Sequence, residues 1–152
     1  MRQVASWRDQ ADAILLAWQP GQEGGHAIAD VLTGAVNPSG RLATTFPVKY
    51  EDAPSARNFP GRVLEGRKNL IDNPFAGVPA EVRYEEGLYV GYRYFDTFDV
   101  KPAYEFGYGL SYTDFKFGDL LLGAQRLGGD VKASVTVTNS GKRPGKAVVQ
   151  VY

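Results

Sequence analysis

Three patterns near the N-terminal end predict a strand, a helix and a second strand in succession. Residues 13–18 (AILLAW) form a continuous apolar run of strand length, which is typical of a parallel strand buried on both faces. Apolar side chains recur on one face of residues 24–32, which predicts a helix, and Gly34 is placed to cap its end. After a turn signal at Asn-Pro-Ser-Gly, residues 41–46 alternate and predict a short strand. This order is that of the closing part of an α/β sheet, with no opening part before it.

The C-terminal end shows a different periodicity. Residues 131–138 (VKASVTVT) alternate between apolar and polar, which predicts a half-buried antiparallel strand. Asn-Ser-Gly-Lys at 139–142 predicts a turn, and residues 146–152 predict the next strand. Residues 119–129 contain a further candidate strand and turn. Because two hairpin strands alone are marginal in water, the pattern indicates a β-sandwich that is only begun.

The middle of the chain lacks a sustained period. Residues 48–83 contain four prolines, and we predict an irregular segment that lies over the surface of a partner. Ten of the chain's nineteen aromatic residues lie in residues 84–112, with glycines between them. Such a mixture favours tight turns and ring packing, with a short helix over 88–95 and a closely packed loop over 104–112.

Composition narrows the classes of function. Seventeen basic and seventeen acidic side chains cancel, which gives no reason to expect nucleic-acid binding or attraction to an anionic membrane. The sequence has no cysteine and a single histidine, His26, so neither a disulfide framework nor a Cys- or His-rich metal site is available. No apolar run is long enough to span a bilayer. We therefore expect no metal and no cofactor.

Four ordered segments resemble glycoside hydrolase family 3, the β-glucosidase and β-xylosidase family. They are AWQPGQEGGHAIADVLTGAVNPSGRLATTFP (17–47), YEEGLYVGYRYFD (84–96), FGYGLSYTDF (106–115) and VTVTNSGKRPGKAVVQVY (135–152). The resemblance implies a TIM-like barrel, an α/β sandwich and a fibronectin type III-like domain in that order. Residues 1–112 would then be the C-terminal part of the α/β sandwich with an aromatic-rich wrap, and residues 113–152 a truncated, all-β fibronectin-like domain. The N-terminal barrel would be missing.

The resemblance also implies a mechanism and its location. Family members are similar to other retaining glycosidases in using a carboxylate nucleophile and a carboxylic acid/base. The nucleophile is an aspartate of the barrel, and the acid/base glutamate lies earlier than residue 11, so no catalytic residue is assigned here. The expectation is part of an exo-acting β-glycosidase, with β-glucosidase first, that is inactive as this chain alone. The alternative is a non-catalytic carbohydrate-binding or structural module.

Gln22 and Glu23 are the candidate substrate-binding residues. They follow the predicted strand 13–18 at the start of the predicted helix, and ligands of open α/β sheets bind outside the carboxyl ends of strands. Helix N-termini also favour a carboxylate. Two interpretations remain open, because Glu23 could also cap the helix and brace the turn, and the helix cap is the favoured of the two.

Other conspicuous residues favour structural roles. Glu85 and Glu86 are adjacent, so in a strand they point to opposite faces and cannot both flank one bond. Core or interdomain packing is favoured over sugar stacking for Tyr84, Tyr89, Tyr92, Tyr94 and Phe95. Core positions are also expected for Trp7 and Trp18, and a surface or packing position for His26.

The partners implied by the resemblance are a β-linked oligosaccharide or glycoside and the missing barrel. Self-association through unpaired strand edges is a further expectation, since residues 131–138 and 146–152 would expose ladder groups. The family resemblance is compatible with a periplasmic or secreted parent protein, and the lack of cysteine fits either compartment.

Overall fold

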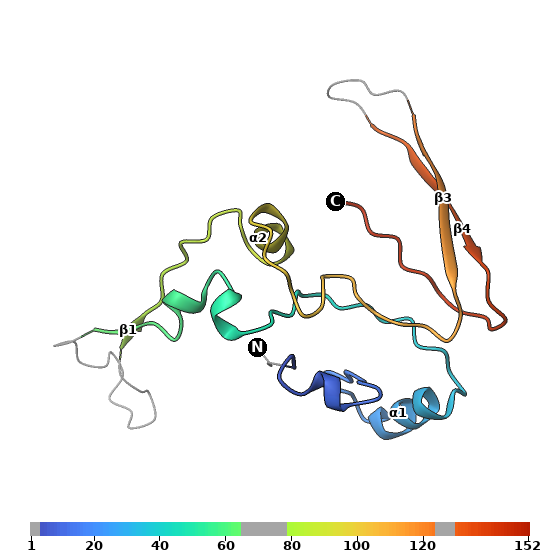
Figure 1. Cartoon of the computed structure of the whole chain (residues 1–152), viewed down its shortest axis with the longest axis horizontal. Helices are drawn as coiled ribbons and strands as arrows, with labels where there is room; N and C mark the ends of the chain where they lie inside the picture. The colour runs from blue at the N-terminus through green and yellow to red at the C-terminus, as the bar shows by residue number, and fades with distance from the viewer. Residues whose placement is uncertain (1–3, 65–78, 124–129) are drawn as a thin grey trace. The chain divides into compact units, whose positions relative to one another are not determined.

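The computed structural model describes residues 4–64, 79–123 and 130–152 (Figure 1). The chain divides into two compact units, each made of two segments that are far apart in the sequence. The first unit joins residues 1–14 to 42–108, and the second joins 15–41 to 109–152. Regular structure in the described part consists of short helices and two two-stranded sheets. No helix in that part combines the length and apolar character needed to cross a bilayer.

Helix α1 (Gly24–Thr33) lies in the second unit and confirms the helix predicted over 24–32. It ends at Gly34, whose φ of 77° lies in the left-handed region that favours glycine. The Gly34 N–H donates to the carbonyl oxygen of Val31 at 3.1 Å, which satisfies one of the carbonyls left open at the helix end. The local sequence signals were therefore sufficient to place this helix.

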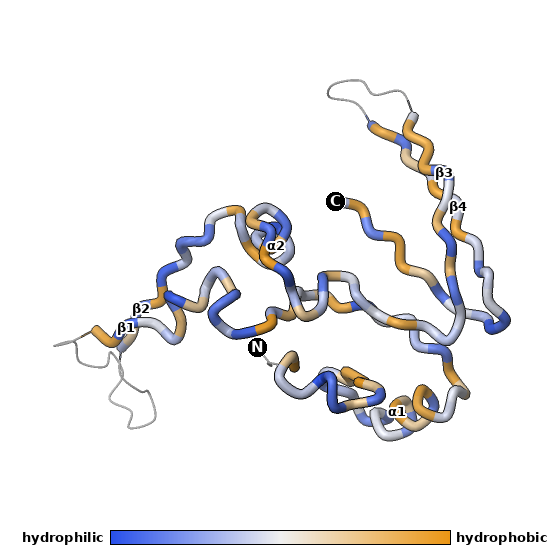
Figure 2. Tube along the Cα trace, viewed as in Figure 1, coloured by the Kyte–Doolittle hydropathy of each residue, from blue (hydrophilic) through white to orange (hydrophobic). Residues whose placement is uncertain are grey.

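Strands β3 (Phe115–Leu122) and β4 (Ala133–Asn139) form an antiparallel hairpin in the second unit (Figure 1). The β4 strand confirms the strand predicted over 131–138 from Ala133 onward, but the predicted half-burial is wrong, because Val137 is exposed and only Val135 is partly covered. The register shifts between Gly118 and Leu121, where two residues of β3 face one of β4. Asp119 has a φ of 49° at this bulge, a left-handed conformation that a short polar side chain tolerates. Apolar residues recur along both strands in Figure 2.

Side-chain hydrogen bonds join the segment after α1 to the base of the hairpin within the second unit. Asn37 donates from Nδ2 to the Pro144 carbonyl at 3.0 Å and accepts from the Tyr112 N–H at 2.8 Å. Thr113 donates from Oγ1 to Asn139 Oδ1 at 2.8 Å, and Asn139 Oδ1 also accepts from the Gly141 N–H. The last contact confirms a turn at 139–142, closed by an asparagine side chain.

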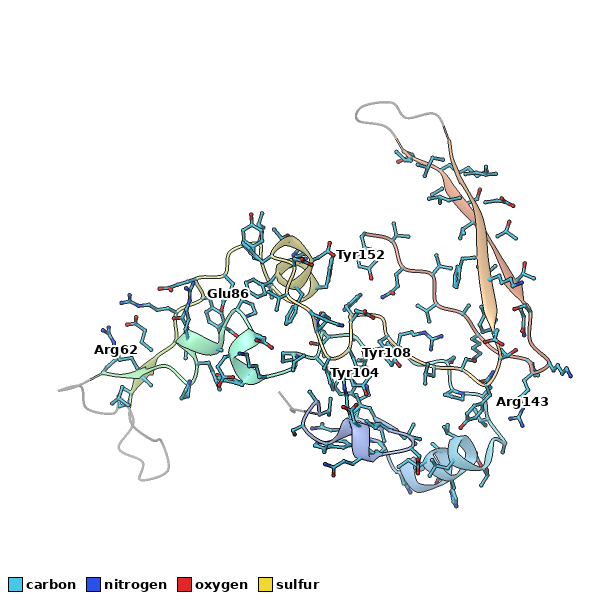
Figure 3. All side chains as sticks on the ribbon, viewed as in Figure 1. Arg62, Glu86, Tyr104, Tyr108, Arg143 and Tyr152 are labelled. Atoms are coloured by element: carbon cyan, nitrogen blue, oxygen red, sulfur yellow. The ribbon has the colours of Figure 1, made fainter. Side chains whose placement is uncertain are left out.

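Arg143 adds a longer-range contact to the same base. Its Nη1 donates to the Gly34 carbonyl oxygen at 3.2 Å, and its guanidinium carbon lies 5.7 Å from the centre of the Tyr112 ring. Figure 3 shows Arg143 at the foot of the hairpin. The end of α1 is therefore held by a residue that comes 109 positions after Gly34.

The first unit is built from short elements joined by irregular chain. Its helices are η1 (Arg8–Gln10), η2 (Tyr50–Asp52), η3 (Ala56–Asn58) and α2 (Tyr92–Thr97), and its strands are β1 (Arg62–Val63) and β2 (Ala80–Glu81). α2 begins four residues later than the helix predicted over 88–95. Gly91 precedes it with a φ of 59°, a conformation through which a right-handed helix cannot continue.

Backbone pairing in the first unit connects residues 42–46 with 104–108. Phe46 and Tyr104 form an isolated antiparallel bridge, and the Leu42 N–H donates to the Tyr108 carbonyl at 2.8 Å. The Tyr104 and Tyr108 rings pack with their centres 4.8 Å apart, and Figure 3 labels both residues. Arg8 lies over the Tyr104 ring and donates to the Ala103 carbonyl at 2.7 Å. The first part of the predicted loop, residues 104–108, is therefore held by backbone and ring contacts, whereas Leu110 further along is 73% exposed and does not fit the expectation of tight packing.

Three predicted strands are wrong in this structure. Residues 13–18 and 146–152 are not strands, and 41–46 is reduced to the single bridge at Phe46. A strand exists only when a neighbour pairs with its backbone, and among the described residues no ladder forms with 13–18 or 146–152. The partner of β4 is accordingly β3 and not the C-terminal segment. Residues 124–129 of the candidate strand and turn at 119–129, and residues 65–78 of the irregular stretch, lie outside the described residues.

Few side chains are buried. In the described part the buried apolar residues are Val4, Pro47, Ala53 and Phe95. Four residues with an expected packing role are instead exposed: Trp7 by 45%, Trp18 by 60%, Tyr84 by 88% and Tyr89 by 46%. The core position is wrong for Trp7 and Trp18, Phe95 is buried as expected, and interdomain packing of Tyr84 and Tyr89 stays a prediction. An apolar side chain favours burial, but the sequence does not identify which segment or domain buries it.

Candidate functional site

The sequence-predicted site residues Gln22 and Glu23 lie in the turn before α1. Both are exposed, and Glu23 occupies the position immediately before the first helical residue. Its carboxylate makes no hydrogen bond to the backbone of the first turn. Glu23 therefore does not cap the helix with its side chain, although it occupies the N-cap position.

Glu23 instead contacts His26, one turn along the helix. Glu23 Oε2 lies 2.6 Å from His26 Nδ1, and the His26 side chain is 87% exposed. His26 is therefore a surface residue, which is one of the two positions expected for it, the other being a packing position. The pair leaves Gln22 and the exposed face of Glu23 open to solvent, so a polar ligand could reach both. Sequence reasoning missed this pair, although a spacing of three residues on a helix brings side chains together.

A second arrangement in the first unit was not predicted. We call it the carboxylate hollow, and it is lined by Glu51, Ala53, Pro54, Arg57, Glu85, Glu86, Tyr89, Tyr94 and Phe98. Short helices η2 and η3 supply one wall, and α2 with the segment before it supplies the other. Figure 3 shows Glu86 in this unit, above the two short helices. The hollow unites residues that are more than thirty positions apart.

Local contacts fix the two walls of the carboxylate hollow. Asp52 accepts from the Lys49 N–H at 3.1 Å and closes the turn of η2. The Tyr50 hydroxyl donates to the Phe59 carbonyl at 2.9 Å, which ties η2 to the chain beyond η3. On the other wall, Arg93 Nε donates to the Leu88 carbonyl at 2.7 Å and holds the chain before α2.

The aromatic side of the carboxylate hollow is a cluster of rings in mutual contact. The Phe98 ring centre lies 5.0 Å from that of Tyr89 and 5.1 Å from that of Tyr94. Edge-on and tilted contacts at such distances are favourable and hold the rings in place. Tyr89 and Phe98 are 46% and 53% exposed, so both rings remain reachable from solvent.

Glu85 and Glu86 both line this hollow. Residues 82–86 are in neither helix nor strand, so the alternation of a strand does not apply to them. Glu85 Oε2 accepts from Asn58 Nδ2 at 3.2 Å. No group of three His, Cys, Asp or Glu side chains in the described part is arranged to hold a metal ion.

A neighbouring depression shares Arg57 and Glu85 with the carboxylate hollow. It is lined by Arg57, Asn58, Phe59, Pro60, Gly61, Arg62, Glu81, Arg83 and Glu85. Arg83 Nε donates to Glu81 Oε1 at 2.6 Å, and this hydrogen bond and the charge of Glu81 raise the pKa of Arg83. Arg83 is therefore positively charged at any working pH and stabilises negative charge on this side.

Comparison with known proteins identifies relatives over most of the chain. The family model described as "Glycosyl hydrolase family 3 C-terminal domain" matches residues 1–92. Beta-glucosidase B of Emericella nidulans is 48% identical over 149 residues, which is 96% of this chain and 17% of that protein. Thermostable beta-glucosidase B of Acetivibrio thermocellus is 43% identical over 148 residues, 96% of this chain and 18% of that protein.

Solved structures agree with the sequence relatives. Beta-glucosidase 3B from Thermotoga neapolitana, solved in complex with glucose, is 50% identical and superposes with a TM-score of 0.77 over 94% of this chain and 18% of that one. A family 3 β-glucosidase from Bifidobacterium adolescentis is 38% identical, with a TM-score of 0.76 over 97% of this chain and 21% of that one. The chain thus spans about a sixth to a fifth of the length of the proteins that it resembles.

Proposed function

Because the chain belongs to the glycosyl hydrolase family 3 C-terminal domain family, we propose that it is a segment of a retaining, exo-acting β-glycosidase. The substrate proposed first is a glycoside with a terminal β-D-glucosyl residue. The observation that carries the proposal is the near-complete coverage of this chain by proteins named β-glucosidase, at identities of 38–50% in the examples given. At such identities the backbone path of the segment is shared as well, as the superposition indicates.

We place residues 1–112 at the end of an α/β sandwich and residues 113–152 at the start of a fibronectin type III-like domain. The β3–β4 hairpin supports an all-β beginning in the second region. The helix α1 with its glycine cap supports an α/β origin for the first. Residues supplied by the longer enzyme, including a barrel domain, would provide the neighbours that 13–18 and 146–152 need to become strands.

The chemistry is proposed to need carboxyl groups from outside this chain. Retaining hydrolysis requires two of them about 5 Å apart, one as nucleophile and one as acid/base. Glu23 is paired with His26 at the surface, and the carboxylates of the hollow have no acidic partner fixed opposite them by a contact in the described part. We expect the isolated chain to bind weakly or not at all and to hydrolyse nothing.

Gln22 and Glu23 are proposed to contribute to the rim of the sugar site. They are exposed polar residues at a helix start, where amide and carboxylate groups can accept and donate to sugar hydroxyls. In the complete enzyme, Glu23→Gln should raise KM more than it lowers kcat, since it would remove binding and not the reacting group.

A segment exchange tests the proposed function. The matching segment of the Thermotoga neapolitana enzyme is replaced by this chain, and turnover of an aryl β-glucoside is compared with that of the 152-residue chain alone. The hybrid should be active and the chain alone inactive. A hybrid that folds cooperatively yet shows no turnover would contradict the proposal, and so would robust turnover by the isolated chain. A sugar-dependent rise in melting temperature of the inactive chain would instead favour a carbohydrate-binding module.

A further inference from the structure

We propose that the β3–β4 hairpin and the C-terminal end of α1 move as one rigid body, held together by hydrogen bonds to the side chain of Asn37. We call the contacts of Asn37 with Ser111, Tyr112 and Pro144 the Asn37 junction. The junction crosses the boundary proposed after Tyr112, so that boundary is a fixed interface and not a flexible linker. The inference takes from the proposed function only the position of this boundary, and it concerns the attachment of the two regions and not hydrolysis.

The amide of Asn37 contacts both chain segments that meet at the base of the hairpin. Its Oδ1 accepts from the Tyr112 N–H at 2.8 Å and from Ser111 Oγ at 3.0 Å, shortly before β3. Its Nδ2 donates to the Pro144 carbonyl at 3.0 Å, beyond β4. Because the acceptor and the donor belong to one planar group, these contacts fix the segment after α1 to both segments of the base at once.

Close packing at Gly145 supports the Asn37 junction independently of hydrogen-bond geometry. A Cβ at Gly145 would lie 2.7 Å from Asn37 Nδ2, and it would also lie 3.0 Å from Thr113 Cγ2 and 3.1 Å from Phe115 Cζ. Glycine is the residue that permits such a close approach of the backbone to other atoms. The chain that leaves the hairpin therefore reaches the Asn37 amide with no room for a side chain between them.

The last turn of α1 is a second point of attachment. The Tyr112 hydroxyl donates to the Val31 carbonyl at 2.7 Å, and Arg143 Nη1 donates to the Gly34 carbonyl at 3.2 Å. The Arg143 guanidinium carbon lies 5.7 Å from the centre of the Tyr112 ring, so the two side chains also attract each other. Contact at a single point would allow rotation of the hairpin about that point, whereas contact at two points opposes it.

Hydrogen bonds within the base connect both attachment points to the strands. Asn139, the last residue of β4, donates from Nδ2 to the Arg143 carbonyl at 2.8 Å and accepts from Thr113 Oγ1 at 2.8 Å. The Ser140 N–H donates to the Asp114 carbonyl at 2.9 Å, next to the first residue of β3. A continuous series of hydrogen bonds thus runs from the end of α1 to both strands.

A flexible hinge after Tyr112 is the alternative. Motion between two regions is the usual case when their interface is neither large nor apolar. Here directional hydrogen bonds act at two separate points, the Asn37 junction and the last turn of α1. Residues 15–41 and 109–152 also form one compact unit. Both observations favour the rigid body over the hinge.

Distances between two spin labels test the rigidity directly, and the lack of cysteine in the chain makes the labelling specific. The labels are attached through Leu32→Cys on α1 and Leu120→Cys on β3, two side chains that are each 66% exposed. The distance distribution should be single and narrow. Asn37→Ala should broaden it, whereas Asn58→Ala, which removes a side-chain hydrogen bond of another half-buried asparagine in the first unit, should not. A broad distribution with Asn37 intact, or a width that Asn37→Ala leaves unchanged, would overturn the proposal.

Amide hydrogen exchange gives a second measurement, made on the 152-residue chain and on the hybrid enzyme, in which the rest of the protein supports the fold. A body that opens as a whole exposes the amides of α1 and β4 together. Asn37→Ala should therefore speed exchange in both elements by a common factor of about tenfold, because hydrogen bonds are lost. Asn58→Ala should speed exchange in neither. Faster exchange in one element alone, or in neither, after Asn37→Ala would refute the rigid body. Turnover enters neither measurement, so that result would leave the proposed function intact.

Discussion

The hydroxyl of Tyr112 donates a hydrogen bond of 2.7 Å to the carbonyl oxygen of Val31, in the last turn of α1. The same carbonyl oxygen also accepts from the Gly34 N–H, so the Tyr112 hydroxyl is a second donor and ties residue 112 to the helix end. We expect Tyr112→Phe to lower the free energy of unfolding by about 1 kcal/mol. Tyr84→Phe is the matched control and should leave stability unchanged, because Tyr84 is almost fully exposed. Chemical denaturation of the two variants measures their free energies of unfolding. Equal losses in the two variants would contradict a stabilising role for the hydrogen bond from Tyr112 to Val31.

Gly141 lies where no side chain fits. A Cβ there would collide with Thr113 Oγ1, and it would lie 2.9 Å from the Asp114 backbone nitrogen. Since Thr113 Oγ1 is itself hydrogen bonded to Asn139, it cannot move without loss. Gly141→Ala should therefore destabilise the second unit by about 2 kcal/mol. Gly118→Ala serves as the comparison, because nothing lies within 4 Å of a Cβ at Gly118. The melting temperature of the Gly118→Ala variant should not fall.

We expect the substitution of threonine by valine to change the free energy of unfolding in opposite directions at two buried threonines. Thr45 Oγ1 is buried without a hydrogen-bond partner in the described part, whereas the equally buried Thr113 Oγ1 is paired with Asn139 Oδ1. Thr45→Val should raise the free energy of unfolding by about 1 kcal/mol, because an unsatisfied hydroxyl is replaced by a methyl group of similar size. Thr113→Val should lower it by about 1–2 kcal/mol. Thermal melts of both variants would show a difference in sign, and a shared sign would reject this account.

Association between chains should depend on the exposed C-terminal segment. Residues 146–152 form no strand in this structure, and Val151 is 88% exposed. An apolar segment with high strand propensity pairs with the sheet edges of other molecules unless charge prevents it. Light scattering on a concentration series should show a lower apparent mass for Val151→Lys than for the parent chain. Leu32→Lys, which also replaces an exposed apolar side chain by lysine but on α1, should have a smaller effect. Equal effects would point to unspecific apolar contact.

Sequence reasoning succeeded where the determinants are local. The helix over 24–32, the left-handed cap at Gly34 and the turn closed by Asn139 each depend on residues within a few positions. Failures involve partners far along the chain. Residues 13–18 and 146–152 have strand-like sequences, yet pairing decides whether a strand forms, and no local pattern names the partner.

The candidate sites divide in the same way. Gln22 and Glu23 were found because a strand-like run and a helix start flank them, and their role in binding stays a prediction. The carboxylate hollow escaped notice because Glu51 and Glu86 meet only through the path of the chain between them. Glu85 and Glu86 were set aside on the geometry of a strand that the structure does not contain. Only the three-dimensional path reveals such a grouping.

The hydrogen bond from Arg143 to the Gly34 carbonyl joins residues 109 positions apart. A ribosome adding 5–20 residues per second therefore takes roughly 5–20 s to deliver this arginine after the glycine has emerged. Throughout that interval the newly made α1 lacks the Arg143 side chain, which later hydrogen bonds to the carbonyl oxygen at its C-terminal end. Nascent polypeptide is thus exposed to chaperones and proteases for a period set by the sequence distance between these two residues, and fewer residues between them would shorten that period of vulnerability.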